Sequence, residues 1–547
     1  MSKFSLQVFI SLSLLYLFAI PATAQNFAKP RLIVTIMVDP LSPQWIEQVK
    51  DQMGSGGINK LLLQGTVFSN AHTGQILSNR SSSVASMSTG TTSSVHGIVG
   101  MTWYDRLRKE EVFSTEDYQI RSMTEYGYRA KHSAHQLLVT SFGDQLKTYS
   151  EGKVISICLE PDGAILGGGH RTDGTYWFDS YSGRWMSNAK FIPSIPQWVI
   201  DFNNNNQPDQ YMTQEWDLLS GSTQYPNAVP DNSPFEIGLF GDKTIFPYKL
   251  KRLQRNSSEG EYEILRHTPF GNTMTTDFTI AALYNEKLGQ DESTDYLNIT
   301  FTAFEKIISL YGYESQEAVD ALLRLDLEIQ HLLYILEENV GRENILVIFS
   351  STHGISWNVD LAASRDLPAG RFRARNSIAL LNSYLSAIYG ENYWIESYLD
   401  QQIYLDQTLI DQNRIPIEDI QEKAARFMIQ FHGVSDAFTA SQLSSAKVIN
   451  PEGSIYLNAF HSNRSGDILV ILKPGWIEDG DFVCDHLSPY PNNQSIPLII
   501  WGGSVSSKIV KETVQLTDIA PSLSEWAGIP QPDACSGISF LKLIFED

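Results

Sequence analysis

The sequence has few cysteines and few positive charges for its length. Its 547 residues include only three cysteines, too few for a disulfide-stapled scaffold or for a zinc site built from thiolates. Lysine and arginine together number 40 against 62 aspartates and glutamates, which leaves a net charge of −22. A chain this acidic has no general attraction to a nucleic acid backbone or to an anionic bilayer. We therefore expect no nucleic acid partner.

Long hydrophobic runs are also missing beyond the N-terminus, where no segment reaches the ~20 uninterrupted apolar residues of a membrane-spanning helix. The start of the chain is different. Lys3 precedes the largely apolar run Phe9 to Ile20, and Ala22-Thr-Ala24 supplies a small-x-small cleavage motif. This pattern is typical of a signal peptide over residues 1–24, and Gln25 follows where a lipoprotein has cysteine. We expect an exported protein, periplasmic or secreted, that does not span the membrane.

The hydrophobic fraction of 42% is enough for a large core. Short apolar runs that end in Gly, Asp, Ser or Pro predict buried, mostly parallel strands, namely Leu32 to Val38, Val154 to Leu159, Ile345 to Phe349, Ile468 to Leu472 and Ile496 to Trp501. Amphipathic stretches predict helices at 317–338, 375–389 and 517–527. This alternation predicts an α/β fold with three layers around a mostly parallel sheet. Reacting groups of such folds lie at the carboxyl ends of the strands.

The segment at about 177–257 is rich in Asn, Pro, Ser and aromatic residues. We interpret it as an inserted cap within one α/β domain that spans residues 25–547. Its aromatic side chains could form a contact surface, although burial inside the cap is the simpler interpretation; they are Tyr176, Trp177, Tyr181, Trp185, Trp198 and Trp216. Cys158 is expected to be a buried thiol, whereas Cys484 and Cys535 could either pair or stay free.

An ordered series of segments between about residues 30 and 545 resembles the alkaline phosphatase superfamily. The first, VTIMVDP, ends a strand at Asp39, and the others are 88–106 (STGTTSSVHGIVGMTWYDR), 155–170 (ISICLEPDGAILGGGH), 268–278 (TPFGNTMTTDF), 322–326 (LLRLD), 347–354 (VIFSSTHG), 485–503 (DHLSPYPNNQSIPLIIWGG) and 516–537 (LTDIAPSLSEWAGIPQPDACSG). The chain is most similar to the phosphate-irrepressible bacterial alkaline phosphatases, which are related to the nucleotide pyrophosphatase/phosphodiesterases. The resemblance implies an alkaline phosphatase-like fold and the chemistry of a two-zinc phosphoric ester hydrolase.

In that family two metals clamp the attacking and leaving oxygens, and a Thr or Ser hydroxyl is the nucleophile. The position of the nucleophile is Arg80 in this chain, and a guanidinium has no nucleophilic atom. The positions that hold the phosphate are Met101, Glu160 and Asp162, where the family has an Asn, a Lys and an Arg. A charge pair ~4 Å apart is worth roughly 4 kcal/mol at an effective dielectric of ~20, so the two inverted charges should repel a phosphate ester. The resemblance therefore implies a degraded active site with no catalytic residue.

Four metal ligands remain by the same comparison: Asp39, Glu305, His353 and His486. Two other ligand positions carry Ser309 and Thr352, so each metal site has lost at least one ligand. We therefore expect no cofactor, or at most one weakly bound divalent metal, where the family uses two zinc ions. Arg80 would then pair with Asp39 and act as a fixed cation in place of a zinc ion.

Three functions are compatible with these residues. The first is a catalytically inactive pseudophosphatase with a binding or scaffolding role at the cell envelope. Its protein partner is unknown, and a basic peptide, a cation or another envelope protein suits the acidic chain better than a phosphoester. The second is an active phosphatase or phosphodiesterase with an altered site, using one metal on His353, His486 and Asp39, or Ser81 as the nucleophile. The third is a protein that binds small molecules or carbohydrates.

Overall fold

The computed structural model describes residues 29–120, 130–219, 224–239, 244–256, 260–447, 453–484 and 487–545. The expected signal peptide, residues 1–24, lies outside these ranges. Across the described ranges, none of the helices combines the length and the apolar character that crossing a lipid bilayer requires.

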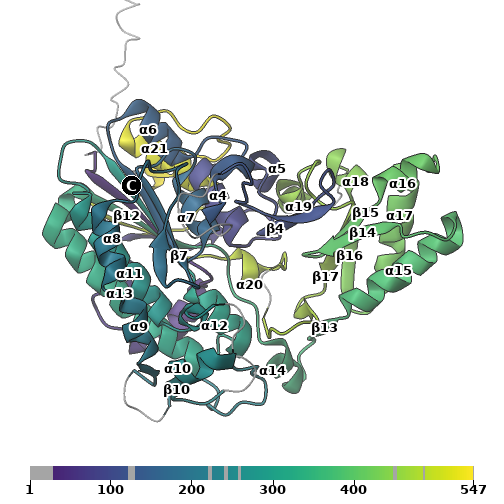
Figure 1. The fold of residues 1–547 in the computed structure, drawn as a ribbon, viewed down its shortest axis with the longest axis horizontal. Coiled ribbons are helices and arrows are strands. Elements are labelled where there is room, and N and C mark those ends of the chain that lie inside the picture. Colours follow the sequence, from purple (N-terminus) through teal and green to yellow (C-terminus); the bar gives the residue numbers. More distant parts are fainter. Residues whose placement is uncertain are drawn as a thin grey trace, which may run out of the picture.

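A large, mostly parallel sheet forms the centre of the molecule (Figure 1). Its nine strands within the described residues run in the order β20-β2-β19-β12-β1-β11-β6-β7-β8. The five neighbouring strands from β12 to β7 are parallel, whereas β19 and β8 run antiparallel to their neighbours. The bounds are β1 Leu32–Val38, β2 Thr66–Phe68, β6 Val154–Cys158, β7 Gly174–Asp179, β8 Arg184–Met186, β11 Asp295–Phe301, β12 Ile345–Ser351, β19 Leu498–Gly502 and β20 Lys508–Val510.

Helices cover both faces of this sheet, which confirms the predicted three-layer α/β fold. Strand β1 shows why, because Val34 and Ile36 join the core on one face while Ile33 and Met37 join the core on the other. One face is covered by α2 Pro43–Val49, α3 Ile58–Gln64, α11 Phe270–Asn285, α12 Ala303–Tyr311 and α13 Gln316–Val340. The other is covered by α4 Arg80–Thr89, α6 Phe142–Tyr149, α7 Pro161–Gly168, α21 Ile519–Ala527 and α22 Leu541–Phe545.

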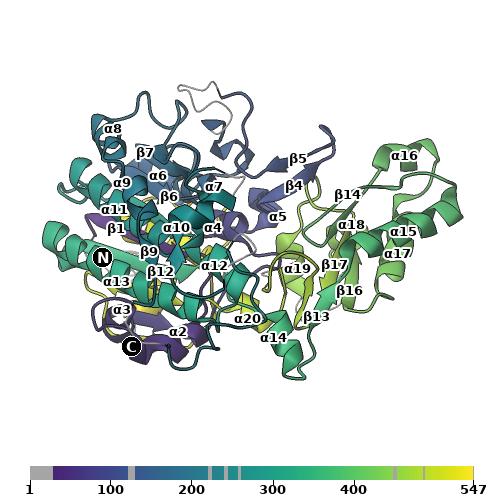
Figure 2. The same ribbon diagram turned by 60° about the horizontal axis from the view of Figure 1, so that its bottom comes forward.

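A second sheet with its own hydrophobic core lies to one side of the central sheet, drawn in green in Figures 1 and 2. Its four strands are antiparallel, in the order β14-β15-β17-β16. Its elements are β14 Ile395–Leu399, β15 Gln402–Leu405, β16 Val434–Thr439, β17 Ile468–Leu472, α15 Ala374–Tyr389, α16 Gln407–Gln412, α17 Ile417–Met428 and α18 Ala440–Ser444. This lobe was not predicted. The run Ile468–Leu472, expected among the mostly parallel strands, belongs to it as β17.

The segment at about 177–257, which we predicted to be an inserted cap, begins on the central sheet and continues over one of its faces. Its short elements are α8 Gln197–Asn204, α9 Gln207–Met212, β9 Glu215–Trp216, β10 Tyr248–Lys249 and α10 Leu250–Leu253. Trp177, Trp185 and Trp216 are buried, and Trp185 stacks on Phe278 of α11 with ring centroids 4.3 Å apart. Tyr181 differs, since 53% of it is exposed. Burial inside the cap therefore accounts for most of these aromatic residues, but not for Tyr181.

The three cysteines are all free thiols. Cys158 lies fully buried in β6, as predicted. Of the two possibilities left open for Cys484 and Cys535, the structure has the unpaired one.

Candidate functional site

The side chains singled out by the sequence meet at the carboxyl ends of the parallel strands. Asp39 follows β1, and Thr352 and His353 follow the neighbouring strand β12. Asp162 lies in the first turn of α7, the helix that follows β6. Arg80 is the first residue of α4. These elements are far apart in sequence, and the parallel pairing of their strands brings their ends to one edge.

Helix α4 carries Arg80 into this edge although its sequence, RSSSVASMST, is poor in strong helix formers. Its N-terminus is fixed by a capping box, in which Asn79 accepts from the Ser82 backbone N–H and the Ser82 hydroxyl bonds back to Asn79. Its C-terminus ends at Gly90 in the left-handed conformation, with φ of 70°. All of its residues are buried. Most of its side chains are small, which lets the helix pack closely against the neighbouring elements.

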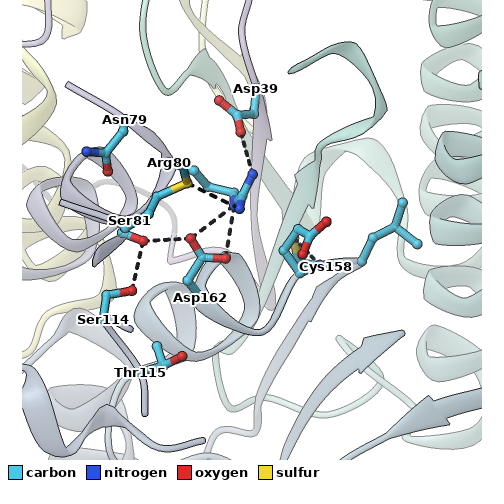
Figure 3. A network of polar contacts seen from close by, with 12 residues as sticks. Asp39, Asn79, Arg80, Ser81, Ser114, Thr115, Cys158 and Asp162 are labelled. Atoms are coloured by element: carbon cyan, nitrogen blue, oxygen red, sulfur yellow. Dashed lines mark hydrogen bonds and ion pairs between the residues drawn. The ribbon is translucent and has the colours of Figure 1, made fainter. Parts of the chain in front are cut away.

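Arg80 is the centre of a buried network of ion pairs (Figure 3). Its Nε lies 2.9 Å and 3.1 Å from the two carboxylate oxygens of Asp162, and its Nη1 lies 3.0 Å from Oδ2 of Asp39. Glu305 of α12 is 3.9 Å from the same Nη1. The pair between Arg80 and Asp39 expected from the sequence is therefore present. Burial alone would lower the pKa of Arg80, but Asp162 and Asp39 raise it above its usual value.

Both oxygens of the Asp39 carboxylate contact neighbouring side chains. Its second oxygen, Oδ1, accepts a hydrogen bond from the Thr352 hydroxyl and lies 3.4 Å from Nε2 of His353. Burial alone would raise the pKa of Asp39, but the hydrogen bond with His353 and the charge of Arg80 hold it well below its usual value. Asp39 is therefore an anion with a partner on each oxygen.

Ser81, the alternative nucleophile, points away from Asp39 in Figure 3 and toward Asp162. Its Oγ donates to Oδ2 of Asp162 over 2.6 Å and lies 2.9 Å from Oγ of Ser114. Two further positions where the resemblance implies other residues carry Met101 and Ser309. Met101 presents its Sδ 3.5 Å from Nη2 of Arg80, and Ser309 on α12 bonds to the Lys306 carbonyl of its own helix.

The sequence did not identify the two further cations of the site. Arg266 lies 3.3 Å from Glu160, and Lys306 lies 3.4 Å from Glu305. Neither residue stands in a motif that marks it, because Arg266 precedes the 268–278 segment and Lys306 follows a metal-ligand position with no recognisable pattern. Together with Arg80 they give the site three cations beside its carboxylates. The negative charges of Glu160 and Asp162 are thus partly balanced by Arg266 and Arg80, which come from elements remote in sequence.

Comparisons with known proteins agree with this architecture. Residues 33–481 match the family of type I phosphodiesterases / nucleotide pyrophosphatases. The chain belongs to this family.

Curated relatives match this family member over more than nine-tenths of its length. Alkaline phosphatase PafA of Elizabethkingia meningoseptica is 28% identical over 94% of this chain and 95% of its own, and alkaline phosphatase PhoV of Synechococcus elongatus is 27% identical over 94% and 92%. The crystal structure of wild-type PafA superposes with a TM-score of 0.90 at 27% identity, covering 95% of this chain and 100% of that one. The alkaline phosphatase-like fold is confirmed.

The comparisons also correct one expectation. We expected no cofactor, or at most one weakly bound divalent metal, and this is wrong, because the chain belongs to this family and its full-length relatives are alkaline phosphatases. For such enzymes the resemblance implies two zinc ions.

The described residues do not fit that pair of ions on their own. Asp39 is engaged by Arg80, Thr352 and His353, and among residues the structure describes no group of three His, Cys, Asp or Glu side chains is arranged to hold a metal. His486, the remaining expected ligand, lies outside the described residues. We derive no reaction step through a metal for this reason.

The family places the chain among the phosphoric ester hydrolases in fold and ancestry. The names of its relatives agree with the second of the functions expected from the sequence, an active hydrolase, better than with the first, an inactive one. The contacts of Arg80 bear on the difference between these two functions.

Proposed function

We propose that this family member is an exported protein that binds a partner at or beside the site around Arg80 and does not hydrolyse phosphoesters. The observation that carries the proposal is the buried Arg80, at the nucleophile position implied by the resemblance and paired with both Asp39 and Asp162. A guanidinium offers no lone pair for attack on phosphorus and is not deprotonated in a protein. The side chain cannot leave this position without unpairing two buried carboxylates.

The groups around Arg80 support the same proposal. A phosphoryl group carries negative charge on its non-bridging oxygens and needs cations or N–H donors to hold it. Here Asp162 faces the site with its charge taken up by Arg80, and Glu160 adds a second carboxylate. The thioether of Met101 donates no hydrogen bond. The charge arrangement therefore favours a positively charged ligand over a phosphoester.

An active hydrolase is the second candidate, and a specific observation favours it. Ser81 donates a hydrogen bond of 2.6 Å to Asp162, so a hydroxyl and a carboxylate that could accept its proton already lie in contact. The full-length similarity to alkaline phosphatases supports this candidate as well.

A turnover assay separates the two candidates. The purified chain without residues 1–24 is incubated with zinc and with p-nitrophenyl phosphate or bis(p-nitrophenyl) phosphate, beside the Elizabethkingia relative as a positive control. We expect no release of p-nitrophenol above that of a buffer blank. Turnover that disappears in Ser81→Ala would establish the second candidate and end the first.

Export is part of the proposal and is tested separately. The support is the signal-peptide pattern of residues 1–24. We expect the mature protein in the periplasmic or extracellular fraction, with an N-terminus at Gln25 by mass spectrometry. Recovery of the uncleaved chain in the cytoplasmic fraction would contradict export without affecting the proposal on catalysis.

A further inference from the structure

A separate cavity of about 310 Å³ lies beside the Arg80 network, with Glu160 in its wall. Aromatic side chains from two parts of the chain form much of its lining, including Phe113 of β5 Glu110–Phe113, Trp177 of β7 and Tyr181 in the turn after β7. Trp177 is buried, whereas Tyr181 is 53% exposed and forms an accessible rim. The exposed Tyr181 is the aromatic residue of the insertion that cap packing does not explain.

The charges of the cavity are mostly negative. Glu116, Glu160 and Asp179 line it, against a single cationic side chain, Arg266. His132 also lines it and adds no charge at neutral pH, because burial lowers its pKa to about 4. Glu116 and Glu160 both line the cavity together with His132.

The guanidinium of Arg266 is already bound by other groups of the protein. Its Nη2 donates to the Phe178 carbonyl over 2.7 Å, and its Nη1 lies 3.3 Å from Glu160 and 3.6 Å from Glu263. These contacts hold the guanidinium to the wall of the cavity. Glu160 pairs with Arg266 and Asp179 accepts hydrogen bonds from Ser182, yet the lining still holds three carboxylates and one cation. This net negative charge in an aromatic setting is the combination that recognises organic cations.

We propose that this cavity binds an alkylguanidinium or alkylammonium group, such as an arginine or lysine side chain. The stem of that side chain packs on the aromatic wall, and its charged head is held by the carboxylates near Glu160. This inference rests on the proposed binding function and names a ligand class for it. The same chemistry can come from a basic peptide or from a free amine, and the experiment distinguishes the two.

Binding is measured by titration calorimetry with three probes: the blocked peptide acetyl-Gly-Arg-Gly-amide, its citrulline counterpart, and agmatine. Citrulline keeps the shape of arginine and lacks its charge. We expect the arginine peptide to bind at least tenfold more tightly than the citrulline peptide. Tighter binding of the peptide than of agmatine assigns the site to a basic peptide, and the reverse order assigns it to a free amine. Equal affinities for arginine and citrulline peptides would overturn the inference.

Two substitutions locate the binding. Glu160→Gln is expected to weaken the arginine peptide at least tenfold, and Tyr181→Leu at the exposed rim about threefold, as expected for the loss of a cation–π contact. Glu512→Gln, at an exposed glutamate remote from the lining, is the matched control and should bind as the unaltered chain does. If Glu160→Gln fails to fold, Tyr181→Leu decides the question. Undiminished binding by a folded Tyr181→Leu would then place the peptide elsewhere and overturn the inference.

The outcome is independent of the proposal on catalysis. Absence of both phosphate release and peptide binding would refute the cation site and leave the binding function without this ligand. Phosphate release would refute the proposed function whatever the peptide does.

Discussion

Two clusters of buried carboxylates differ in whether a cation neutralises their charge. In the candidate site, Asp39 and Asp162 are paired with Arg80 over 2.9–3.0 Å. In the second cluster, Glu236 of the 177–257 segment and Glu317 of α13 form no ion pair with a described residue. Neither oxygen of Glu236 accepts a hydrogen bond within the part of the chain that the structure describes. Glu317 accepts one, from the Tyr248 hydroxyl, and its Oε2 accepts none from a described residue.

The difference decides which cluster stays charged. Burial, together with the charges of Glu317 and Asp231, raises the pKa of Glu236 to about 9, and burial raises the pKa of Glu317 to about 8. These groups therefore carry protons at neutral pH, whereas Asp39 stays ionised beside its guanidinium. A salt-bridged cluster of this kind preserves a charge pattern that can recognise a ligand, and a protonated cluster does not.

The substitution with the largest expected effect removes Arg80, the cation of the charged cluster. Arg80→Met removes the guanidinium that both Asp39 and Asp162 share and leaves them only their remaining contacts with Thr352, His353 and Ser81. Removing one partner of a buried ion pair costs about 3–5 kcal/mol. We expect the free energy of unfolding, measured by urea denaturation at pH 7, to fall by that amount. A loss below about 1 kcal/mol would show that the network contributes little to stability, unlike what its geometry indicates.

A second test measures how stability depends on pH in the cluster of Glu236 and Glu317, which is uncharged at neutral pH. The folded-state pKa of Glu236 lies above its unfolded value of 4.5, so the native chain holds a proton that the unfolded chain releases, and stability falls as pH rises from about 4.5 to about 9. Glu236→Gln does not titrate. We expect it to match the unaltered chain at pH 4 and, after allowance for partial solvent screening, to be about 1–2 kcal/mol more stable at pH 9.

Thermal denaturation across this pH range measures the effect, and Glu422→Gln on α17, at an exposed ion pair, serves as its control. A Glu236→Gln variant with the same pH profile as the unaltered chain would show that the Glu236 carboxylate is solvated or paired in solution. The comparison between the two clusters would then fail.

A smaller test probes the hydroxyl within the charged cluster. Ser81→Ala removes one hydrogen bond to Asp162, whose carboxylate keeps Arg80 as a partner. We expect a loss of about 1 kcal/mol in the free energy of unfolding, measured by urea denaturation. A loss as large as that of Arg80→Met would mean that Ser81 holds the network together rather than joining it.

The smallest expected effect concerns an exposed pair of the second lobe. Arg426 and Glu422 lie 2.5 Å apart on α17, with side chains 74% and 57% exposed. Arg426→Met should change stability by about 0.5 kcal/mol or less, because water already screens this pair. A loss comparable to that of Arg80→Met would remove burial as the explanation for the difference.

Local pattern predicted the elements of the fold better than their pairing. The helices expected at 317–338 and 375–389 are α13 and α15, and the five apolar runs are all strands. One run was misplaced, because Ile468–Leu472 is β17 of the second lobe. The run Ile496–Trp501 overlaps β19 of the central sheet, which is antiparallel to β12. An apolar run indicates that a strand is buried, but its direction and partners are set by contacts remote in sequence.

The site shows the same division. Resemblance pointed to Asp39, Arg80 and Asp162, and the predicted ion pair between Arg80 and Asp39 is present. The pair between Arg80 and Asp162 was not predicted. The resemblance did not locate Arg266 or Lys306, because a cation on another helix becomes a neighbour of Glu160 or Glu305 only after the helices pack. The expectation about cofactors failed for a different reason, since it inferred an absence from single positions while the whole chain matches a family of hydrolases.

By itself, the sequence determined the layered α/β core, the order of its segments and the presence of an arginine at residue 80, where the resemblance implies a hydroxyl. These depend on residue type and spacing along the chain. Only the tertiary structure decided which carboxylates the guanidinium of Arg80 neutralises and which remain unpaired. The physical reason is that the charge state of a buried group depends on distances of a few ångströms to groups from other strands and helices. Those distances exist only once the sheet has assembled.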